Sequence, residues 1–501
     1  MNDESRMAVV TGAGSGLGRA IAMRLARRAH AHVLAWESPA TLTGAAAAPF
    51  SVKQSSAGAG DRPCAFRRAP AAANLGLRGR GTACILRHAD RPDPSKGVPT
   101  MKPVSIRSFA CASFAAWAAL LSAGAVAQDV IRIGAPLPIT GALSPEAKKL
   151  QNGMNLWMET ANKAGGIKVG AKRMKIEIVP VDYQSNTPRA VQATEKLVTQ
   201  DKVDFMFSPM GSGATKAASS VSEKYQIPTI AATASSEQVY DQGYKYLFGV
   251  YTPNQTLTEP LADLVKKQAA GVQRVAILAR NDLFPLAIAQ EMEKSAKKRG
   301  MNVMYFEKYA IGTLDHASAL SQIKSLAPHW IFATGYMNDL ILIKKQMADL
   351  GIEAPVVTMI AGPAYKEFVS ALGKGAENVT SAAWWHPAVR YKGKDVFGTT
   401  ENFNKLFRDK YGLDPDYGEA SAAASGVVLQ LAIEAAGTTD KKAVREQLAK
   451  MNTMTFFGPI KFGPNGQVDS LDPPVFQVQK GTQVVILPAA IKQGNLQLGV
   501  K

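Results

Sequence analysis

Short apolar segments alternate with longer segments of helical periodicity along the chain after residue 129. An apolar run of about four to eight residues is typical of a buried strand, and apolar residues recurring every three or four positions indicate an amphipathic helix. The first series predicts strands at 130–136, 174–181, 203–207 and 229–232, and helices at 145–163, 189–199 and 214–225.

The same alternation restarts near residue 274. This second series predicts strands at 274–279, 302–306, 330–334 and 356–359, and helices at 286–298, 318–326 and 340–350. Two later helices are expected at 401–411 and 420–436, and a terminal strand pair at 475–479 and 484–487. Strands that alternate with helices form parallel sheets covered on both faces. The pattern therefore predicts an α/β protein with two doubly wound lobes.

Residues 1–100 do not share this pattern. A short strand runs into the glycine-rich segment 11–18, TGAGSGLG, and a helical pattern follows to residue 36. Residues 7–36 thus resemble the opening of a short-chain dehydrogenase. Residues 38–100 are rich in Ala, Arg, Gly and Pro and cannot bury a core. We therefore interpret residues 1–100 as a non-native or disordered leader, from a gene fusion, a frameshift or a misplaced start.

A secretion signal is predicted at residues 101–127. Lys102 and Arg107 form a basic start, residues 109–126 are apolar or small, and Ala125-Val126-Ala127 matches a signal-peptidase site. The apolar run is also about as long as a membrane anchor. We favour cleavage after Ala127, because the cleavage pattern directly ends the run, and we expect a periplasmic mature protein.

Charge and cysteine content exclude several functions. The chain has a net charge of +18, but residues 128–501 hold 42 Lys and Arg against 34 Asp and Glu, without long basic runs. This distribution argues against a nucleic-acid partner. All three cysteines precede residue 128, and the histidines after it have no metal-ligand spacing. We therefore expect no catalytic cysteine, no metal site and no cofactor in the mature part.

Five stretches after residue 129 carry a family resemblance through their order and spacing. They are IRIGAPLPITGALS from residue 131, NKAGGI from 162, VDFMFSPMGSGATKAASSVSEKYQIPTIAATASS from 203, RVAILARNDLFPLAIAQ from 274 and FFGPIKFGPNGQ from 456. Together they resemble the type I periplasmic solute-binding proteins of ABC importers, in particular the Leu/Ile/Val-binding-protein-like receptors. The resemblance covers residues 129–501.

The resemblance implies two lobes joined by three crossings, with a ligand enclosed between them. We place the crossings near Gly249, Ser381 and Gly458. Lobe one is then 128–249 plus 382–457, and lobe two is 250–381 plus 458–501. The family implies a monomeric, non-catalytic receptor for a hydrophobic amino acid or a related small carboxylate or amide, with a membrane permease as its partner.

Two loops after strands offer groups that suit a carboxylate. Ser212 precedes the helix that begins near residue 214, and Thr233, Ala234 and Ser235 follow the next strand. Free N–H groups at a helix N-terminus favour an anion, and hydroxyl groups add donors. The alternative is simple helix capping, since Ser and Thr are common caps. The resemblance favours ligand binding.

The resemblance also assigns ligand contacts to aromatic residues. Phe284 and Tyr336 stand where related receptors contact ligand from lobe two, and we choose Trp385 from the Trp384–His386 segment near the second crossing. The alternative for each is packing in the core.

Met359 falls where amino-acid receptors of this family carry an acidic residue for the ligand's ammonium group. Because an unpaired buried ammonium is costly, either Asp282 supplies the charge or the ligand has no α-amino group. Asp282 is otherwise an ordinary turn residue.

Two other classes of function stay open. A short-chain dehydrogenase would need a Tyr-x-x-x-Lys pair, and none of the thirteen tyrosines is followed by Lys at that spacing. A sensory ligand-binding protein would share the fold, and neighbouring permease or kinase genes would separate transport from sensing.

Overall fold

The computed structural model describes residues 7–11, 32–36, 50–51 and 130–499. The chain divides into two units, residues 1–107 and 108–501. In the first unit, β1 (Met7–Thr11) pairs in parallel with β2 (His32–Trp36), which pairs antiparallel with β3 (Phe50–Ser51). The glycine motif and the signal segment lie outside the described residues, so both stay predictions.

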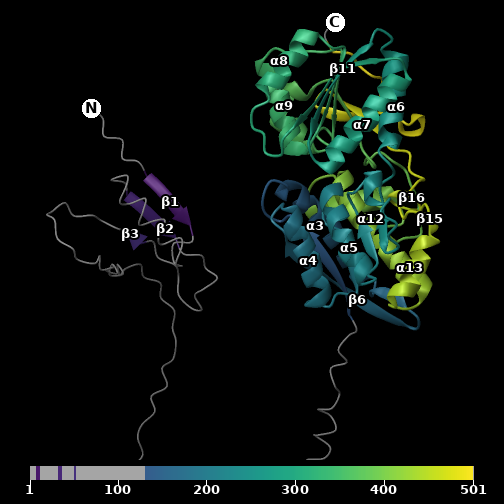
Figure 1. The fold of residues 1–501 in the computed structure, drawn as a ribbon. Helices are drawn as coiled ribbons and strands as arrows, with labels where there is room; N and C mark the ends of the chain where they lie inside the picture. Colours follow the sequence, from purple (N-terminus) through teal and green to yellow (C-terminus); the bar gives the residue numbers. More distant parts are fainter. Residues whose placement is uncertain (1–6, 12–31, 37–49, 52–129, 500–501) are drawn as a thin grey trace, which may run out of the picture. The chain divides into compact units, whose positions relative to one another are not determined.

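The second unit contains two lobes, each built on its own sheet (Figure 1). The sheet of lobe one is parallel except at β5, which pairs antiparallel with β6. In sheet order its strands are β5 (Ile167–Val169), β6 (Lys172–Asp182), β4 (Val130–Leu137), β7 (Phe205–Phe207), β8 (Thr229–Ala231) and β9 (Leu247–Gly249).

Helices cover both faces of this sheet. On one face α3 (Ser144–Lys163) packs lengthwise against α12 (Tyr417–Ala436), and on the other α4 (Thr187–Thr199) packs against α5 (Ser212–Lys224). Asp416 and Glu419 form a capping box at the start of α12, which explains why that helix begins three residues before the predicted one. Lobe one also contains η2 (Glu237–Val239), α11 (Thr400–Tyr411), α13 (Lys441–Ala449) and the hairpin of β15 (Asn452–Thr455) and β16 (Gly458–Lys461).

The sheet of lobe two is parallel from β11 to β14 and antiparallel at its C-terminal strands. Its strands, in sheet order, are β11 (Asn302–Tyr309), β10 (Arg274–Arg280), β12 (Trp330–Thr334), β13 (Val356–Ile360), β14 (Val379–Ala382), β17 (Val475–Gln479) and β18 (Thr482–Leu487). Its helices are α6 (Gln255–Gln268), α7 (Leu283–Lys298), α8 (Ala317–Leu326), α9 (Met337–Asp349), α10 (Lys366–Leu372), η3 (Gly373–Ala376) and η4 (Ala489–Ile491).

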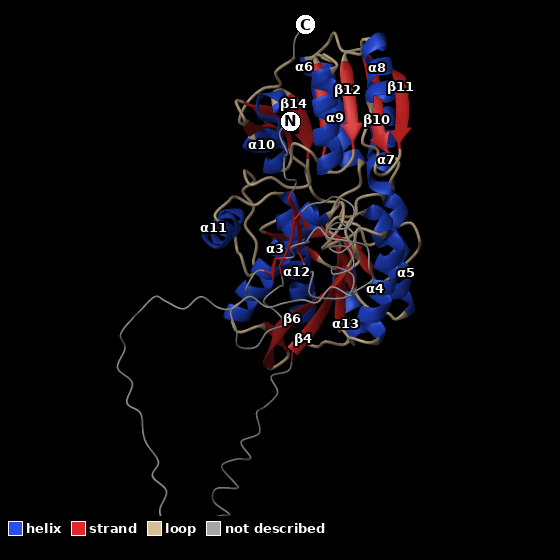
Figure 2. Ribbon diagram, turned by 90° about the vertical axis from the view of Figure 1, so that its left-hand side faces the viewer, coloured by secondary structure: helices blue, strands red, loops and turns tan. Residues whose placement is uncertain are grey.

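Figure 2 shows the two lobes from the side. The order of the elements along the chain requires that it pass between the lobes in three segments. The first follows β9 and the second follows β14, close to the predicted crossings. The third lies later than the predicted Gly458, because Gln467 still pairs with Gly249 at the edge of lobe one. The chain then enters lobe two at β17. This is a correction to the predicted lobe boundary.

The fold confirms the predicted α/β class with two lobes, whose sheets are mainly parallel and carry antiparallel strands at β5, β17 and β18. Sequence patterns missed α6, which carries Pro260 in its interior. They also missed the short strands β5, β9 and β14. Among the described residues, no single helix has the length and apolar composition to cross a membrane, and the bent pair α12–α13 meets that test by length and composition only.

Candidate functional site

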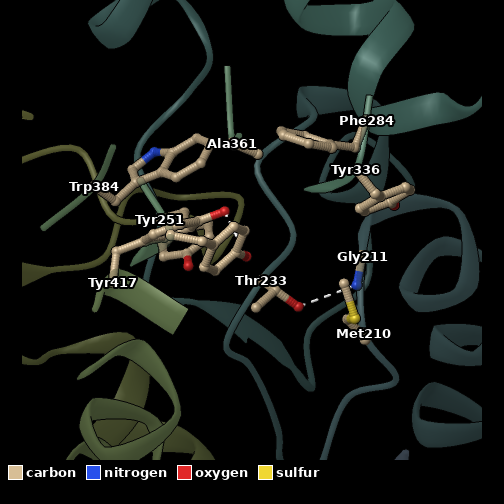
Figure 3. Close-up of a pocket in the computed structure, with 10 residues that line it drawn as sticks. Met210, Gly211, Thr233, Tyr251, Phe284, Tyr336, Ala361, Trp384 and Tyr417 are labelled. Carbon is tan, nitrogen blue, oxygen red and sulfur yellow. Dashed lines mark hydrogen bonds between the residues drawn. The ribbon is translucent and has the colours of Figure 1, made fainter. Parts of the chain in front are cut away.

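A small pocket lies between the two lobes, and the space around it, including part that is open to solvent, amounts to about 330 Å³ (Figure 3). Both lobes contribute to its wall, and most contributing loops follow the carboxyl ends of strands, where ligands bind in doubly wound sheets. The lining residues are Met210, Gly211, Thr233, Tyr251 and Tyr417 from lobe one and its crossing, and Phe284, Tyr336, Ala361, Tyr365 and Trp384 from lobe two and its crossing.

One end of the pocket is formed by the loop before α5. The Gly211 amide donates to the Thr233 hydroxyl oxygen at 3.0 Å, which ties the loops after β7 and β8 together. Gly211 has φ +80°, and a Cβ there would stand 2.8 Å from the Tyr336 hydroxyl oxygen, so only glycine fits. Helix α5 begins at Ser212, and the first N–H groups of a helix have no partner within it. This end suits an anion.

The rest of the wall is aromatic. Tyr251 and Trp384 stack with ring centroids 4.1 Å apart and an angle of 8° between their planes. Phe284 lies 6.2 Å from Trp384 and 6.0 Å from Tyr336. The Trp384 indole N–H donates to the Thr252 carbonyl at 3.0 Å, which fixes the orientation of the ring. The wall therefore presents flat, apolar ring surfaces to the pocket.

The tyrosine hydroxyl groups of the wall remain neutral. Burial raises the pKa of Tyr251, Tyr336, Tyr365 and Tyr417 far above the ordinary value for tyrosine. Two of these hydroxyl groups are bonded to each other across the lobes, since Tyr365 donates to Tyr417 at 2.8 Å. No lining residue is charged among those that the structure describes.

The structure brings three of the predicted site residues to the pocket: Thr233, Phe284 and Tyr336. Ser212 is fully buried behind it, and its hydroxyl oxygen accepts from the Ser235 and Ser236 amides at 3.2 Å each. Ser212 thus holds the two loops together. Ala234 and Ser235 are buried beside it and do not line the pocket.

Met359 and Trp385 lie in the core and not on the pocket wall. Met359 is fully buried in the apolar core of lobe two, and Ala361, two positions later, lines the pocket. Trp385 packs edge-on against Phe403, with centroids 5.8 Å apart. Its neighbour Trp384 lines the pocket instead.

Asp282, the predicted alternative acid, does not line the pocket. It caps α7, and its Oδ1 accepts from the Leu283 amide at 2.7 Å. Its Oδ2 lies 3.8 Å from the Arg280 guanidinium group. With its charge partly neutralised by Arg280, Asp282 is poorly placed to pair with a ligand's ammonium group.

Sequence reasoning missed most of the aromatic wall. Tyr251 lies in the first crossing, two residues after β9, and Tyr417 directly follows the helix cap Asp416. Tyr365 follows the β13 strand by five residues. The sequence could have indicated these residues only by their positions after a strand or a helix cap. Many aromatic residues of the core have the same kind of position.

Comparison with known proteins finds relatives of this chain, and the family match lies in its second unit. Residues 130–483 match the family described as periplasmic binding protein. The chain is similar to a Leu/Ile/Val-binding protein homologue of Brucella suis, with 24% identity over 395 residues that cover 76% of this chain and 97% of the relative.

Solved structures share the fold. A branched-chain amino acid transporter substrate-binding protein from Streptococcus pneumoniae, in complex with isoleucine, matches with a TM-score of 0.63 and 24% identity, over 72% of this chain and 100% of that one. A solute-binding protein of an ABC transporter from R. palustris, in complex with benzoate, matches with a TM-score of 0.61 and 20% identity, over 74% and 97%.

Proposed function

Because the chain belongs to the periplasmic binding protein family, we propose that it is the exported receptor of an ABC importer, and that its ligand is a small carboxylate with a flat apolar body. It is a solute-binding protein and not an enzyme, as the sequence predicts. The finer assignment of the ligand depends on the pocket.

The observation that carries this proposal is the uncharged pocket wall beside a helix N-terminus. The start of α5 and the Thr233 hydroxyl suit a carboxylate. No lining residue among those described offers a carboxylate to an ammonium group. Burying an ammonium group without a partner charge costs on the order of several kcal/mol. An aromatic carboxylate therefore fits better than an α-amino acid.

Closure of the two lobes is the proposed mechanism of binding. Ligand contacts come from both lobes, so a bound solute stabilises the arrangement in which they meet. The three connecting segments would act as the hinge. A branched-chain amino acid is the second candidate ligand, because the Streptococcus pneumoniae structure contains isoleucine and the Brucella relative is named for leucine, isoleucine and valine.

A thermal-shift comparison of benzoate, benzamide, benzylamine and L-leucine tests the ligand class. We expect benzoate to stabilise the chain by about 2.7 kcal/mol at a hundredfold excess over Kd. Benzamide and benzylamine keep the ring and lack the carboxylate, so they should give no shift. A thermal shift with leucine and none with benzoate would show that the ligand is an amino acid and not an aromatic carboxylate. No shift with any small solute would contradict the receptor function.

Export after cleavage at Ala127 is a separate proposal. We expect the native protein, isolated from the periplasm, to begin at Gln128 and to run as a monomer, with a membrane permease as its transport partner. Mass spectrometry of its N-terminal peptides is the measurement. Peptides from residues 1–100 in the native protein would contradict both the cleavage site and the interpretation of that segment as a non-native leader.

A further inference from the structure

Glu146 joins the two lobes beside the pocket. It lies in the first turn of α3 in lobe one, and its Oε1 accepts from the backbone amide of Met337 in lobe two at 3.2 Å. Met337 is the first residue of α9, directly after the pocket residue Tyr336. A hydrogen bond from Glu146 therefore fixes the backbone that carries Tyr336 against lobe one.

The Glu146 carboxyl group is buried by both lobes. The residue is 3% exposed, and its second oxygen, Oε2, has no hydrogen-bond partner among the described residues. A buried carboxylate with an unpaired oxygen is costly when it is ionised. The N-terminal ends of α3 and α9 offset part of this cost, because both favour negative charge.

The groups around Glu146 come from several elements. Lys149, one turn along α3, favours its ionised form, and Asp339 in α9 disfavours it. Burial is the largest effect on the pKa of the Glu146 carboxyl group, and both burial and Asp339 raise this pKa. Hydrogen bonds from its own amide and from the Met337 amide lower it, as does Lys149, and the resulting pKa is about 7. Three tyrosines are also close enough for the charge of Glu146 to raise their pKa, namely Tyr336, Tyr365 and Tyr417.

Lys149 is itself bound to acidic residues and does not neutralise Glu146 alone. Its Nζ lies 2.6 Å from Asp416 and 3.0 Å from Glu367, and Glu367 belongs to lobe two. Glu419 lies at 4.0 Å. Burial and the neighbouring Asp416 raise the pKa of Glu419. Glu419 and Asp416 both lie in lobe one, so their mutual contact does not depend on closure.

We propose that Glu146 is a positioning residue that latches the two lobes over the bound solute, and that closure takes up a proton at its carboxyl group. The proposal rests on the proposed function, because it assumes a receptor that opens and closes. When the lobes separate, Glu146 loses Met337, Asp339 and Tyr365 and returns to water. Its carboxyl group then has the ordinary properties of an exposed Glu near a helix start.

The direction of the pH effect follows from this difference. A carboxyl group with pKa about 7 in the closed form and about 4.3 in water binds a proton on closure between these values. Closure, and with it solute affinity, should therefore strengthen as pH falls through 7. From pH 8 to pH 6 the expected gain is about tenfold.

Hydrogen exchange at the Met337 amide, measured with and without benzoate, tests the latch in the full chain. In E146A the amide loses its acceptor, and we expect exchange about tenfold faster than in the wild type. In E146Q the acceptor oxygen remains, so protection should be retained. After correction for intrinsic exchange, wild-type protection should rise from pH 8 to pH 6 relative to E146Q. Equal exchange in wild type and E146A, with and without benzoate, would overturn the latch.

Benzoate affinity at the two pH values tests the coupling to solute. The wild type should bind about tenfold more tightly at pH 6 than at pH 8, and E146Q should show no such change. E367Q is the matched control, because it removes an exposed carboxylate that also joins the lobes. Its benzoate affinity should depend on pH as strongly as that of the wild type. If benzoate affinity changed equally with pH in the wild type and E146Q, Glu146 would not be the group that takes up the proton. Failure of benzoate to bind would contradict the proposed ligand, and the Met337 exchange would still decide the latch.

Discussion

Replacing Trp384 with alanine is expected to weaken solute binding about a hundredfold, or about 2.7 kcal/mol. Trp384 is the largest aromatic surface of the pocket, and it stacks on Tyr251 at 4.1 Å. Its removal also leaves the Thr252 carbonyl without its indole donor. Calorimetric titration of the full chain with benzoate, and with L-leucine as the second candidate ligand, measures the loss.

Trp385→Phe is the matched control for this loss. Trp385 packs edge-on against Phe403 in the core, and its indole N–H has no hydrogen-bond partner among the described residues. Phenylalanine keeps most of this packing, so affinity should stay within about twofold, with a stability cost of about 1 kcal/mol. If W385F weakened binding as much as W384A, the pocket wall would be wrongly assigned between these two adjacent residues.

The choice between the two tryptophans shows a limit of the sequence. The resemblance placed an aromatic contact near the second crossing, and the structure brings Trp384 to the pocket and Trp385 to the core. Which one faces the ligand depends on the register of the chain after β14, and that register is set by pairing with β17. Met359 lies in the core and Ala361 on the pocket wall, because Met359 is within β13 and Ala361 comes just after the strand ends.

The fold itself was predictable because its signal is local. Each buried strand is a short apolar run, and each long helix carries its own apolar stripe. The pocket wall has no such pattern. Tyr251, Tyr365 and Tyr417 are far apart in sequence, and only the tertiary fold brings their rings together. Thr233 was predictable because a hydroxyl residue directly after a strand has a recognisable place in this type of sheet.

The contact between α3 and α12 gives the second large effect, on stability. Gly153 of α3 lies directly against α12, and a Cβ there would stand 2.1 Å from the Glu419 carbonyl oxygen and 2.9 Å from the Ala422 side chain. Backbone cannot move aside as a flexible side chain can, so the two helices would have to separate. Gly426 of α12 is equally close to the Trp157 ring, at 2.1 Å. The interface depends on both glycines.

Gly153→Ala is therefore expected to destabilise the protein by about 3 kcal/mol, although alanine is the better helix former by about 1 kcal/mol. Urea unfolding followed by circular dichroism measures the change. Gly271→Ala is the control: no atom lies within 4 Å of its added Cβ, so its stability should change by less than about 0.5 kcal/mol. Because α12 begins at the pocket residue Tyr417, G153A should also weaken binding. A G153A chain as stable as its parent would show that the helices tolerate a wider separation.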